Sequence, residues 1–281
     1  MKVAFAGESG SYAELAAREY FGQNAKLVSV KEFSDVFNAV ANDQCKYGII
    51  PIENSMAGSI HQNYDLLLER NLHISGEIYL RVGHFLIGNK NSKIKDITHA
   101  YSHPQALTQC KNYLKKKGII PVPCSNTAYA VKKVRDDKLF NAAAISSMKA
   151  AADFDMKILD SNIEDNEWNT TRFLILSKNL KKLRRSNEPR KTSIVFSTKN
   201  IPGALFKCLA VFALRDIDLF KIESRPVNGK GFEYIFYLDF SGDLQSEDRK
   251  NAISHLQEIT TFYRNMGSYP VGRHVNPECN P

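Results

Sequence analysis

Short apolar runs alternate with amphipathic segments through the first 178 residues of the chain. Runs of about four to eight apolar residues predict strands, and apolar positions spaced by three and four predict helices. The predicted strands are VAFA, LVSV, GIIPI, EIYLRVGHFLIG, a run ending near Tyr101, IIPVP, AAAI and RFLIL. The predicted helices begin at Ala13, near Asp35, after Ser59, at Pro104 (continuing to about Lys117), after Asn126 and after Ser147. This alternation is typical of an α/β region with a mostly parallel sheet, and the number of strands favours two lobes with a cleft between them.

The pattern changes after residue 191. It predicts strands over 193–197, 219–225 and 232–240, helices over 203–215 and 247–262, and a final strand. Asn228-Gly229 predicts a hairpin between the second and third strands, because a type I′ turn needs positive φ at both central residues. The order is that of a ferredoxin-like βαββαβ unit, a fold that commonly serves as a binding module but does not by itself assign function.

A basic stretch separates the two patterns. From Lys178 to Lys191 the chain carries seven basic residues and one acid, Glu188, with no apolar periodicity, so we predict a solvated linker. Aromatic side chains that would stack bases are absent from it, which argues against nucleic acid as a partner. The expected organisation is an α/β region over 1–178 (lobe 1 about 1–76 and 158–178, lobe 2 about 77–157), a linker over 179–191, a βαββαβ unit over 192–274 and a tail over 275–281.

Composition supports this division and narrows the class of protein. A chain of 281 residues predicts about two domains at ~150 residues each, and 43% hydrophobic with 24% charged residues is ordinary globular usage. No apolar run approaches a signal sequence or a membrane span. The five cysteines are widely spaced and form no C-x-x-C pair, so we expect neither a zinc site nor a disulfide framework, and a cytoplasmic location. The net charge of +8 is compatible with small anionic substrates.

Two polar turns near the start of the chain are candidate binding sites. Gly7-Glu8-Ser9-Gly10-Ser11 follows a strand and opens a helix, so it presents N–H groups to anions, and Ser11 with Glu14 has capping-box spacing. A purely structural turn is the alternative, since G-x-G-x-x-G is incomplete. Glu53-Asn54-Ser55 ends a buried strand, where α/β sheets bind ligands. The alternative there is a polar turn that caps the next helix.

Further polar turns follow later strands. In Tyr101-Ser102-His103-Pro104-Gln105, Pro104 at the first helical position makes Ser102 or His103 the N-cap, and Gln105 shares a face with Gln109. A solvated helix face is the alternative. Ser125-Asn126-Thr127 enters another helix. Asn169-Thr170-Thr171-Arg172-Phe173 offers Arg172 as a carboxylate clamp, with a salt bridge between lobes as the alternative. Together these turns predict a cleft for a small polar anion.

These residues resemble a known family, the monofunctional prephenate dehydratases, across nearly the whole chain. The matching motifs are Gly7-x-x-Gly10-x-Tyr12-x-Glu14-x-Ala16-Ala17, Pro51-Ile52-Glu53-Asn54-Ser55 with Gly58, Ser102-His103-Pro104-Gln105-Ala106-Leu107 with Gln109-Cys110, Asn126-Thr127-Ala128-x-Ala130, Asn169-Thr170-Thr171-Arg172-Phe173 and Glu223-Ser224-Arg225-Pro226. The resemblance implies a two-lobed catalytic region like type II periplasmic binding proteins and a C-terminal ACT regulatory domain. It begins at the first residue, so we expect no fused chorismate mutase domain. Ala13 departs from the usual Ser or Thr.

The resemblance also implies an activity and a set of site residues. The reaction is the decarboxylating dehydration of prephenate to phenylpyruvate, without metal or cofactor. Thr171 matches the family's catalytic threonine, which we expect to act as a positioned donor, with Glu53 or water as proton source. Asn54, Ser102 and Gln109 are the implied orienting residues. The implied substrate-binding residues are Arg172, Glu53, Ser55, Thr170, Asn126, Thr127, Gly10, Ser11 and Tyr12.

For the C-terminal unit the resemblance implies regulation by phenylalanine. The implied binding residues are Asn200, Ile201, Pro202, Gly203, Ala204, Leu205, Glu223, Ser224, Arg225 and Pro226. A unit that only dimerises is the alternative. The expected partners are prephenate, L-phenylalanine and further copies of the chain in a homodimer or homotetramer, with no nucleic acid and no membrane. Arogenate dehydratase and a non-catalytic metabolite sensor are the alternative functions.

Overall fold

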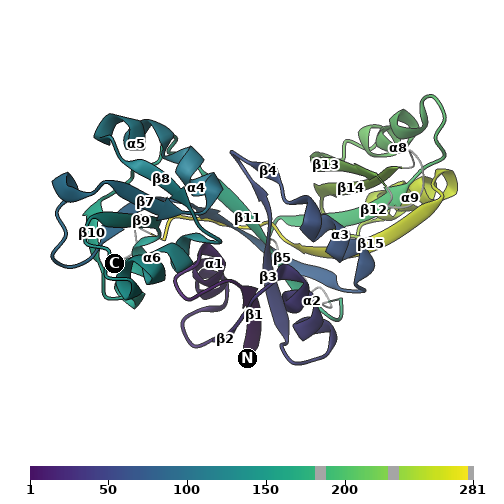
Figure 1. Cartoon of the computed structure of the whole chain (residues 1–281). Helices are drawn as coiled ribbons and strands as arrows, with labels where there is room; N and C mark the ends of the chain where they lie inside the picture. Colours follow the sequence, from purple (N-terminus) through teal and green to yellow (C-terminus); the bar gives the residue numbers. More distant parts are fainter. Residues whose placement is uncertain (181–187, 227–233, 278–281) are drawn as a thin grey trace. The chain divides into compact units, whose positions relative to one another are not determined.

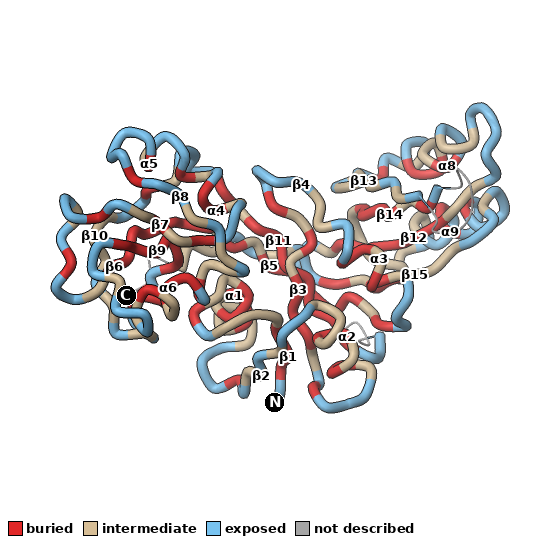
Figure 2. The backbone as a smooth tube through the Cα atoms, in the orientation of Figure 1, coloured by how far each residue is buried: buried red, intermediate tan, exposed pale blue. Residues whose placement is uncertain are grey.

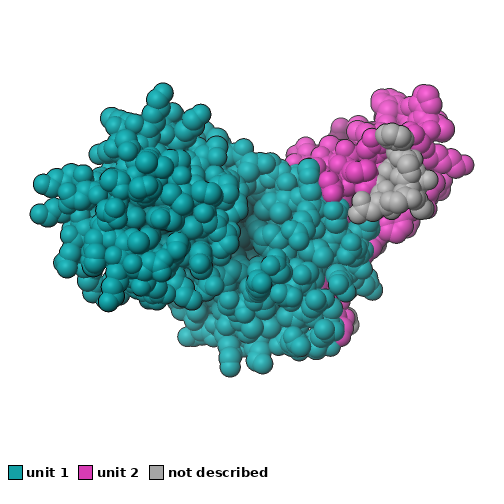
Figure 3. Space-filling view, viewed as in Figure 1, with its two compact units in different colours: residues 1–71, 78–175, 273–281 teal, residues 72–77, 176–272 magenta. Residues whose placement is uncertain are grey.

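The computed structural model describes residues 1–180, 188–226 and 234–277, and the chain divides into two compact units (Figure 3). Unit 1 comprises Met1–Asn71, Ile78–Ile175 and Arg273–Pro281, and unit 2 comprises Leu72–Glu77 and Leu176–Gly272. Each unit has its own buried core. Buried residues follow the strands, whereas exposed residues gather on loops and outer helix faces (Figure 2). No helix in the described ranges combines the length and apolar character that a membrane crossing requires.

Lobe 1 of unit 1 is built on a seven-stranded sheet in the order β16-β5-β11-β3-β1-β2, with β4 beside β3 (Figure 1). Its strands are β1 Lys2–Ala6, β2 Lys26–Val30, β3 Tyr47–Asn54, β4 Gly58–Ser59, β5 His73–Arg81, β11 Thr170–Ser177 and β16 His274–Val275. β1 runs parallel to β2 and β3. β11 returns from lobe 2 and lies between β3 and β5, so the last long strand of this sheet is inserted at its centre.

The helices of lobe 1 are α1 Tyr12–Phe21, α2 Phe33–Ala41 and α3 His61–Glu69. α1 begins at Ser11, whose side chain accepts from the N–H of Glu14, and ends at Gly22. Ala13, Ala16 and Ala17 repeat at helical spacing and pack on Phe5 of β1 and Ile49 of β3. Small side chains at these positions let the helix approach the sheet closely.

Lobe 2 repeats the same strand order on a five-stranded sheet, β10-β6-β9-β7-β8. The entering strand, β6, lies between β9 and β10, just as β11 lies between β3 and β5. β7 is parallel to β8 and β9, and β6 is antiparallel to its neighbours. The elements of lobe 2 are β6 Phe85–Gly88, η1 Ile94–Asp96, β7 His99–Ser102, α4 Pro104–Gln109, α5 Lys111–Lys117, β8 Ile120–Pro123, α6 Thr127–Asp136, β9 Ala142–Ser146, α7 Met148–Asp153 and β10 Lys157–Asp160.

Alternating residues of the lobe 2 strands face two different helix layers. Leu86 and Ile145 pack with the α4–α5 side of the lobe, including Leu107. Phe85 and Ala144 pack with α6 and α7 on the other side. A sheet with helices on both faces is buried on both faces, which explains why its strands appear as continuous apolar runs in the sequence.

Unit 2 is a four-stranded antiparallel sheet in the order β13-β14-β12-β15 with two helices on one face. Its elements are β12 Arg190–Ser197, α8 Ala204–Ala213, β13 Leu219–Pro226, β14 Tyr234–Ser241, α9 Glu247–Ile259 and β15 Phe262–Pro270. Phe212 of α8 and Leu256 of α9 pack on Ile194 and Leu238 of the sheet. The predicted fold class, a two-lobed α/β region followed by a βαββαβ unit, is therefore confirmed.

Several predicted boundaries differ from those in the structure. β5 belongs to the lobe 1 sheet as far as Arg81, beyond the expected boundary at residue 76, and β10 joins lobe 2 rather than lobe 1. The single helix expected from Pro104 divides at Cys110, whose ψ of 19° interrupts the helical turn. The helix expected to reach Phe262 ends at Ile259 because Phe262 pairs with Ser197 in the sheet. The predicted Asn228-Gly229 hairpin lies outside the described residues.

The C-terminal end of the predicted linker is folded. β12 begins at Arg190, which pairs with Asp243, and Lys191 is 2% exposed. The Lys191 ammonium lies 2.8 Å from the Glu77 carboxylate, which is also buried, within unit 2. The linker prediction is thus wrong for these two basic residues. At the other end, the expected tail begins inside β16, because His274 and Val275 pair with β5.

Candidate active site

Two adjoining cavities open in unit 1, and polar side chains line both. One cavity, about 190 Å³, is lined from lobe 1 by Tyr12, Asn54 and Thr171 and from lobe 2 by residues of α4 and the start of α6, and we call it the inner pocket because it adjoins Thr171. The outer pocket, about 390 Å³, is lined by residues around Met56, by α4 and by the loop 165–169. Gln105 and Gln109 line both, so the two pockets are parts of one cleft.

Asn54 and Thr171 meet at the wall of the inner pocket. Asn54 is the last residue of β3 and Thr171 lies near the start of β11, so strand pairing places them side by side. The Asn54 amide nitrogen donates to the Thr171 hydroxyl oxygen at 2.9 Å and to Asn169 Oδ1 at 2.8 Å. Since the Thr171 oxygen accepts this bond, its own O–H is free to donate into the pocket.

A second half of the network comes from lobe 2. Gln109, the last residue of α4, accepts through Oε1 from Asn169 Nδ2 at 3.1 Å and lies 2.8 Å from His84 Nε2. Because the Gln109 oxygen faces it, we assign the imidazole proton to His84 Nε2. Burial lowers the pKa of His84, although the bond to Gln109 and the charge of Glu164 oppose this, so the imidazole is neutral at neutral pH.

The direction of these bonds fixes what the cleft offers to a ligand. Asn54 Oδ1 already accepts from the backbone N–H groups of Met56 and Ala57, and Gln109 Oε1 accepts twice. Within this network the groups left over are donors: the Thr171 hydroxyl and the Gln109 amide hydrogen that is not directed at Asn169 Oδ1, 3.5 Å away. A surface of preorganised neutral donors stabilises carboxylates and oxygens that gain negative charge during a reaction.

Helix N-termini complete the inner pocket. His103 is the N-cap of α4, its Nδ1 accepting from Gln105 N–H at 3.2 Å, and burial lowers its pKa. Asn126 is the N-cap of α6, its Oδ1 accepting from the Tyr129 N–H at 2.7 Å. Thr127 follows it at the first helical position and lines the pocket. These placements agree with the polar turns singled out in the sequence.

Other residues implied by the resemblance lie away from the cleft wall. Ser102 is fully buried and donates to the Ile145 carbonyl in the neighbouring strand at 2.6 Å. Arg172 points away from Thr171, as strand alternation requires, and its guanidinium lies 6.0 Å from the centre of the Tyr79 ring. Glu53 pairs with Ser59 in the β3–β4 hairpin and does not line either pocket.

Ser55 and Thr170 brace the loop that precedes Thr171. The Ser55 hydroxyl donates to the Trp168 carbonyl at 2.8 Å and accepts from the Thr170 N–H at 2.9 Å. Thr170 lines a separate cavity with Tyr79 and Trp168. These two residues therefore hold β3 and β11 together rather than reaching the inner pocket.

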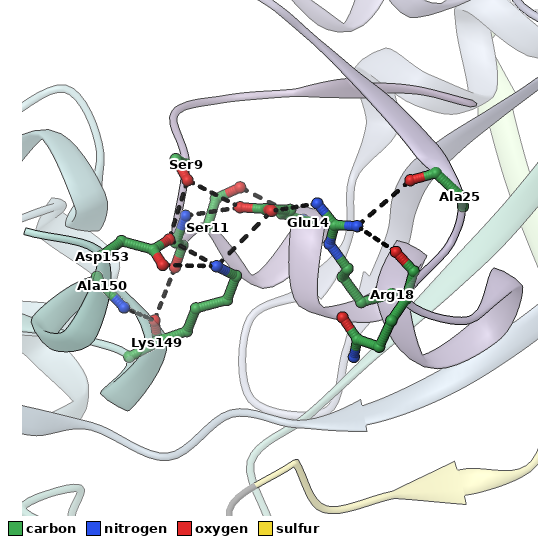
Figure 4. Close-up of polar contacts among 11 residues, drawn as sticks. Ser9, Ser11, Glu14, Arg18, Ala25, Lys149, Ala150 and Asp153 are labelled. Atoms are coloured by element: carbon green, nitrogen blue, oxygen red, sulfur yellow. Dashed lines mark hydrogen bonds and ion pairs between the residues drawn. The ribbon is translucent and has the colours of Figure 1, made fainter. Parts of the chain in front are cut away.

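The glycine-rich turn 7–11 forms a contact between the lobes (Figure 4). The Gly10 carbonyl accepts from Ser147 Oγ at 2.7 Å, and a Cβ on Gly10 would lie 2.7 Å from Ala150 Cα. The Gly10 N–H donates to Glu14 Oε2 at 2.8 Å. In the expected capping box this carboxylate would instead accept from the N–H of the N-cap, Ser11. The Gly10 backbone is thus part of a contact between the lobes, and Ser11 caps α1. These bonds favour the structural turn at Gly10, and anion binding at the turn stays a prediction. Only Tyr12 of this motif reaches the inner pocket.

Charged side chains surround the same contact. Ser9 Oγ donates to Asp153 at 2.9 Å across the lobes, and Lys149 Nζ lies 2.6 Å from Asp153 and 3.7 Å from Glu14 (Figure 4). Glu14, although nearly buried, also faces Arg18 at 3.4 Å. We call the set Ser9, Gly10, Glu14, Ser147, Lys149 and Asp153 the lobe contact.

Sequence reasoning missed two residues of the donor network. His84 was hidden inside an apolar run, where a histidine normally means core packing. Asn169 was noted only as part of a motif, yet it is 1% exposed and bonded to both Asn54 and Gln109. A side-chain amide that is buried in this way needs hydrogen-bond partners within the protein. Burial and partners are visible in the structure, whereas the sequence does not show them.

The residues implied for phenylalanine lie in two segments of unit 2. Asn200–Leu205 leads into α8, with Gly203 as its N-cap at φ 77°, and Glu223–Pro226 ends the edge strand β13. Alternate residues of β13 are exposed. No ligand contact tests this assignment, so it stays a prediction.

Known proteins share this architecture and sequence. The chloroplastic arogenate dehydratase/prephenate dehydratase 2 of Arabidopsis thaliana is 45% identical over 96% of this chain and 73% of its own length. A solved structure described as GqqA, a quorum-quenching acylase, matches with a TM-score of 0.90 at 29% identity over 97% of this chain and 98% of its own. A prephenate dehydratase of Arthrobacter aurescens in complex with L-Phe matches with a TM-score of 0.89 at 26% identity, over 97% and 90% of the two chains.

The fold and the cleft define a two-lobed α/β protein with a polar cleft between its lobes, into which neutral hydrogen-bond donors point. The model of the family described as prephenate dehydratase matches residues 3–181, which include both lobes. The chain belongs to the prephenate dehydratase family, hydro-lyases of aromatic amino acid biosynthesis, and its relatives include both prephenate and arogenate dehydratases.

Proposed function

We propose that this protein is a prephenate dehydratase, which converts prephenate to phenylpyruvate with loss of carbon dioxide and water. The single observation that carries the proposal is the chain of bonds from His84 through Gln109, Asn169 and Asn54 to Thr171. It leaves a hydroxyl donor and an amide donor facing a pocket of about 190 Å³. Prephenate, a cyclohexadiene with two carboxylates and one hydroxyl, suits such a surface.

The geometry supports a role for Thr171 at the departing oxygen. When the ring carboxylate leaves as carbon dioxide, its electron pair moves into the ring and the C4–O bond breaks, so negative charge grows on that oxygen. The Thr171 hydroxyl, oriented because Asn54 donates to it, is placed to stabilise this charge. The described lining of the inner pocket includes no carboxylic acid. We therefore assign to water, rather than to Glu53, the proton that converts hydroxide to water.

A direct assay tests the proposal. Purified full-length protein is given prephenate, and phenylpyruvate is followed by its ultraviolet absorbance, with arogenate in a parallel reaction read out as phenylalanine. Turnover of prephenate that is lost in Asn54→Ala and retained in Ser102→Ala is the expected result, because only Asn54 belongs to the donor network. Absence of prephenate turnover by the wild-type protein overturns the proposal.

We further propose that unit 2 is an ACT regulatory domain through which phenylalanine inhibits the enzyme. Support comes from the βαββαβ fold and from the start of α8, where no side chain caps the helix and the N-terminal end of its dipole attracts a carboxylate. Inhibition requires that phenylalanine bind one conformational state better than another. Calorimetry with L-phenylalanine, with L-tyrosine as the matched ligand, is the test. No binding, or binding that leaves turnover unchanged, contradicts the proposal.

Apolar side chains on the surface of unit 2 support a homodimer or homotetramer. Phe206 and Leu214 of the α8 segment are 75% and 82% exposed, and Phe220 and Ile222 of the edge strand β13 are 47% and 43% exposed. An exposed edge strand with apolar side chains is a template for pairing with another copy. Sedimentation of the full chain is expected to give a mass of two or four chains, and a monomer at micromolar concentration contradicts this proposal.

A further inference from the structure

The outer pocket has one charged residue in its described lining, Asp165. Its other lining residues are amides, a hydroxyl and two apolar side chains. Asp165 belongs to the loop that joins β10 to β11, and its N–H donates to the Gln109 carbonyl at 2.7 Å. Its carboxylate oxygen Oδ2 accepts from the Asn112 N–H at 3.1 Å, so its position against α5 is fixed by the backbone.

The charge of Asp165 is not neutralised within the described part of the chain, where no lysine or arginine lies at ion-pair distance from it. The neighbouring acid, Glu164, differs in this respect. Its carboxylate is 3.2 Å from the Arg81 guanidinium and accepts from the His84 N–H at 2.9 Å. Of two adjacent acids, one is therefore used structurally and the other places a negative charge at the cleft.

The proposed reaction orients the substrate along the two pockets. If the departing C4 oxygen is at Thr171 in the inner pocket, C1, with the ring carboxylate and the side chain, lies at the opposite end of the ring. The outer pocket, which shares Gln105 and Gln109 with the inner one, is the space that we assign to the side chain. This side chain ends in a keto acid in prephenate and in an ammonium-bearing amino acid in arogenate. The two substrates thus differ at the end that faces Asp165.

We propose that Asp165 is a specificity-determining residue, which raises the preference of this site for the amino substrate arogenate relative to the keto substrate prephenate. The inference rests on the proposed function and deepens it, since one site then accepts both molecules. A carboxylate attracts an ammonium group, gives nothing to a ketone and acts about equally on the carboxylates that the two substrates share. The ratio of kcat/KM for arogenate to kcat/KM for prephenate therefore reports the charge of Asp165 more directly than either value alone.

Asp165→Asn isolates the charge, because an amide oxygen still accepts the Asn112 N–H. We expect kcat/KM for arogenate, divided by that for prephenate, to fall roughly three- to tenfold, chiefly through the KM for arogenate. In the wild type the ratio should also fall with added salt, whereas the ratio of the variant should not, since exposed charges are screened. Glu167→Gln is the matched control, because it removes a nearby exposed acid that lines a different cavity and leaves the ratio unchanged.

The outcomes separate the two proposals. An equal ratio in wild type and Asp165→Asn overturns the specificity role, as does a wild-type enzyme that turns over prephenate but not arogenate. A wild type active only on arogenate contradicts the prephenate assignment, and the role of Asp165 then stands if Asp165→Asn raises the KM for arogenate more than Glu167→Gln does. Inactivity on both substrates overturns the function itself.

Discussion

The donor network and the lobe contact both join the two lobes of unit 1, yet they use different chemistry. The network consists of neutral, buried or half-buried groups, in which Asn54 donates to both Asn169 and Thr171, and Asn169 and His84 both donate to Gln109. The lobe contact is ionic and partly exposed, and it includes one close backbone approach at Gly10. Both began as polar turns in the sequence. The difference shows that a polar turn can form a ligand-binding site only where some of its hydrogen-bond donors are not already bonded within the protein.

Thr171→Val gives the largest expected effect and tests the network side of this contrast. Removing a preorganised donor lowers kcat by about 10²- to 10³-fold, whereas Thr171→Ser, which keeps a hydroxyl, stays within roughly tenfold. Steady-state kinetics with prephenate provides the measurement, and circular dichroism checks that both variants fold. Turnover by the valine variant within a few-fold of wild type would show that the hydroxyl has no catalytic role.

Gly10→Ala tests the lobe contact by its backbone. Gly10 has a φ of 82°, and a Cβ there would lie 2.7 Å from Ala150 Cα, so we expect a loss of about 2–3 kcal/mol in the free energy of unfolding. Gly58→Ala is the matched control, since its φ is 78° but nothing lies within 4 Å of the added Cβ. That variant loses only the conformational part, about 1 kcal/mol. Equal losses in urea titrations of the two variants would contradict a tight joint at Gly10.

The neutrality of the network predicts how stability depends on pH. Because the pKa of His84 is lowered on folding, the unfolded chain binds more protons as pH falls below about 6.5, so stability is complete above that value and declines below it. Replacing His84 with Gln keeps a donor toward Gln109 and removes the titration. At pH 5.5 the wild type should have lost about 1 kcal/mol more than His84→Gln, relative to pH 7.5.

This comparison has its own internal control. His73 and His103, whose pKa values are also lowered by burial, remain in both proteins, so their contributions cancel. Urea unfolding at the two pH values supplies the measurement. Parallel losses in the two proteins would mean that His84 does not stay neutral in the folded state.

Glu14→Gln gives the smallest expected effect and tests the ionic part of the lobe contact. The variant keeps an acceptor for the Gly10 N–H but loses the charge that faces Arg18 and Lys149. Both cations are about a quarter exposed, so we expect a loss of roughly 0.5 kcal/mol at low salt that shrinks at 1 M salt. A loss that ignores salt would assign the role of Glu14 to its hydrogen bond alone.

The contrast also shows what sequence can and cannot predict. The periodicity of apolar residues predicted the strands and helices, because each element must bury one face whatever the details of its packing. It missed the break at Cys110 and the fold of Lys191 into β12, since a buried ion pair with Glu77 depends on a partner more than a hundred residues away. Charge alone made Lys191 look like part of a solvated linker.

The sequence predicted where the site lies better than it predicted what each of its residues does. Asn54, Gln109 and Thr171 converge, as their places at strand and helix ends indicate, but Ser102 and Arg172 do not join them on the cleft wall. Side-chain direction near a strand end depends on the local register, which a motif does not record. His84 and Asn169 were missed because their function lies in bonds to other side chains rather than in exposure to ligand.

The central position of β11 has a consequence for how the chain is made. Its neighbours β3 and β5 are synthesised long before β11, and the sheet cannot join them until residues 170–177 emerge. Thr171 belongs to that late strand, so all the other residues that line the inner pocket are synthesised before the residue that supplies the catalytic hydroxyl. Assembly of the first lobe must therefore wait for the whole of the second, which links translation order to the onset of activity.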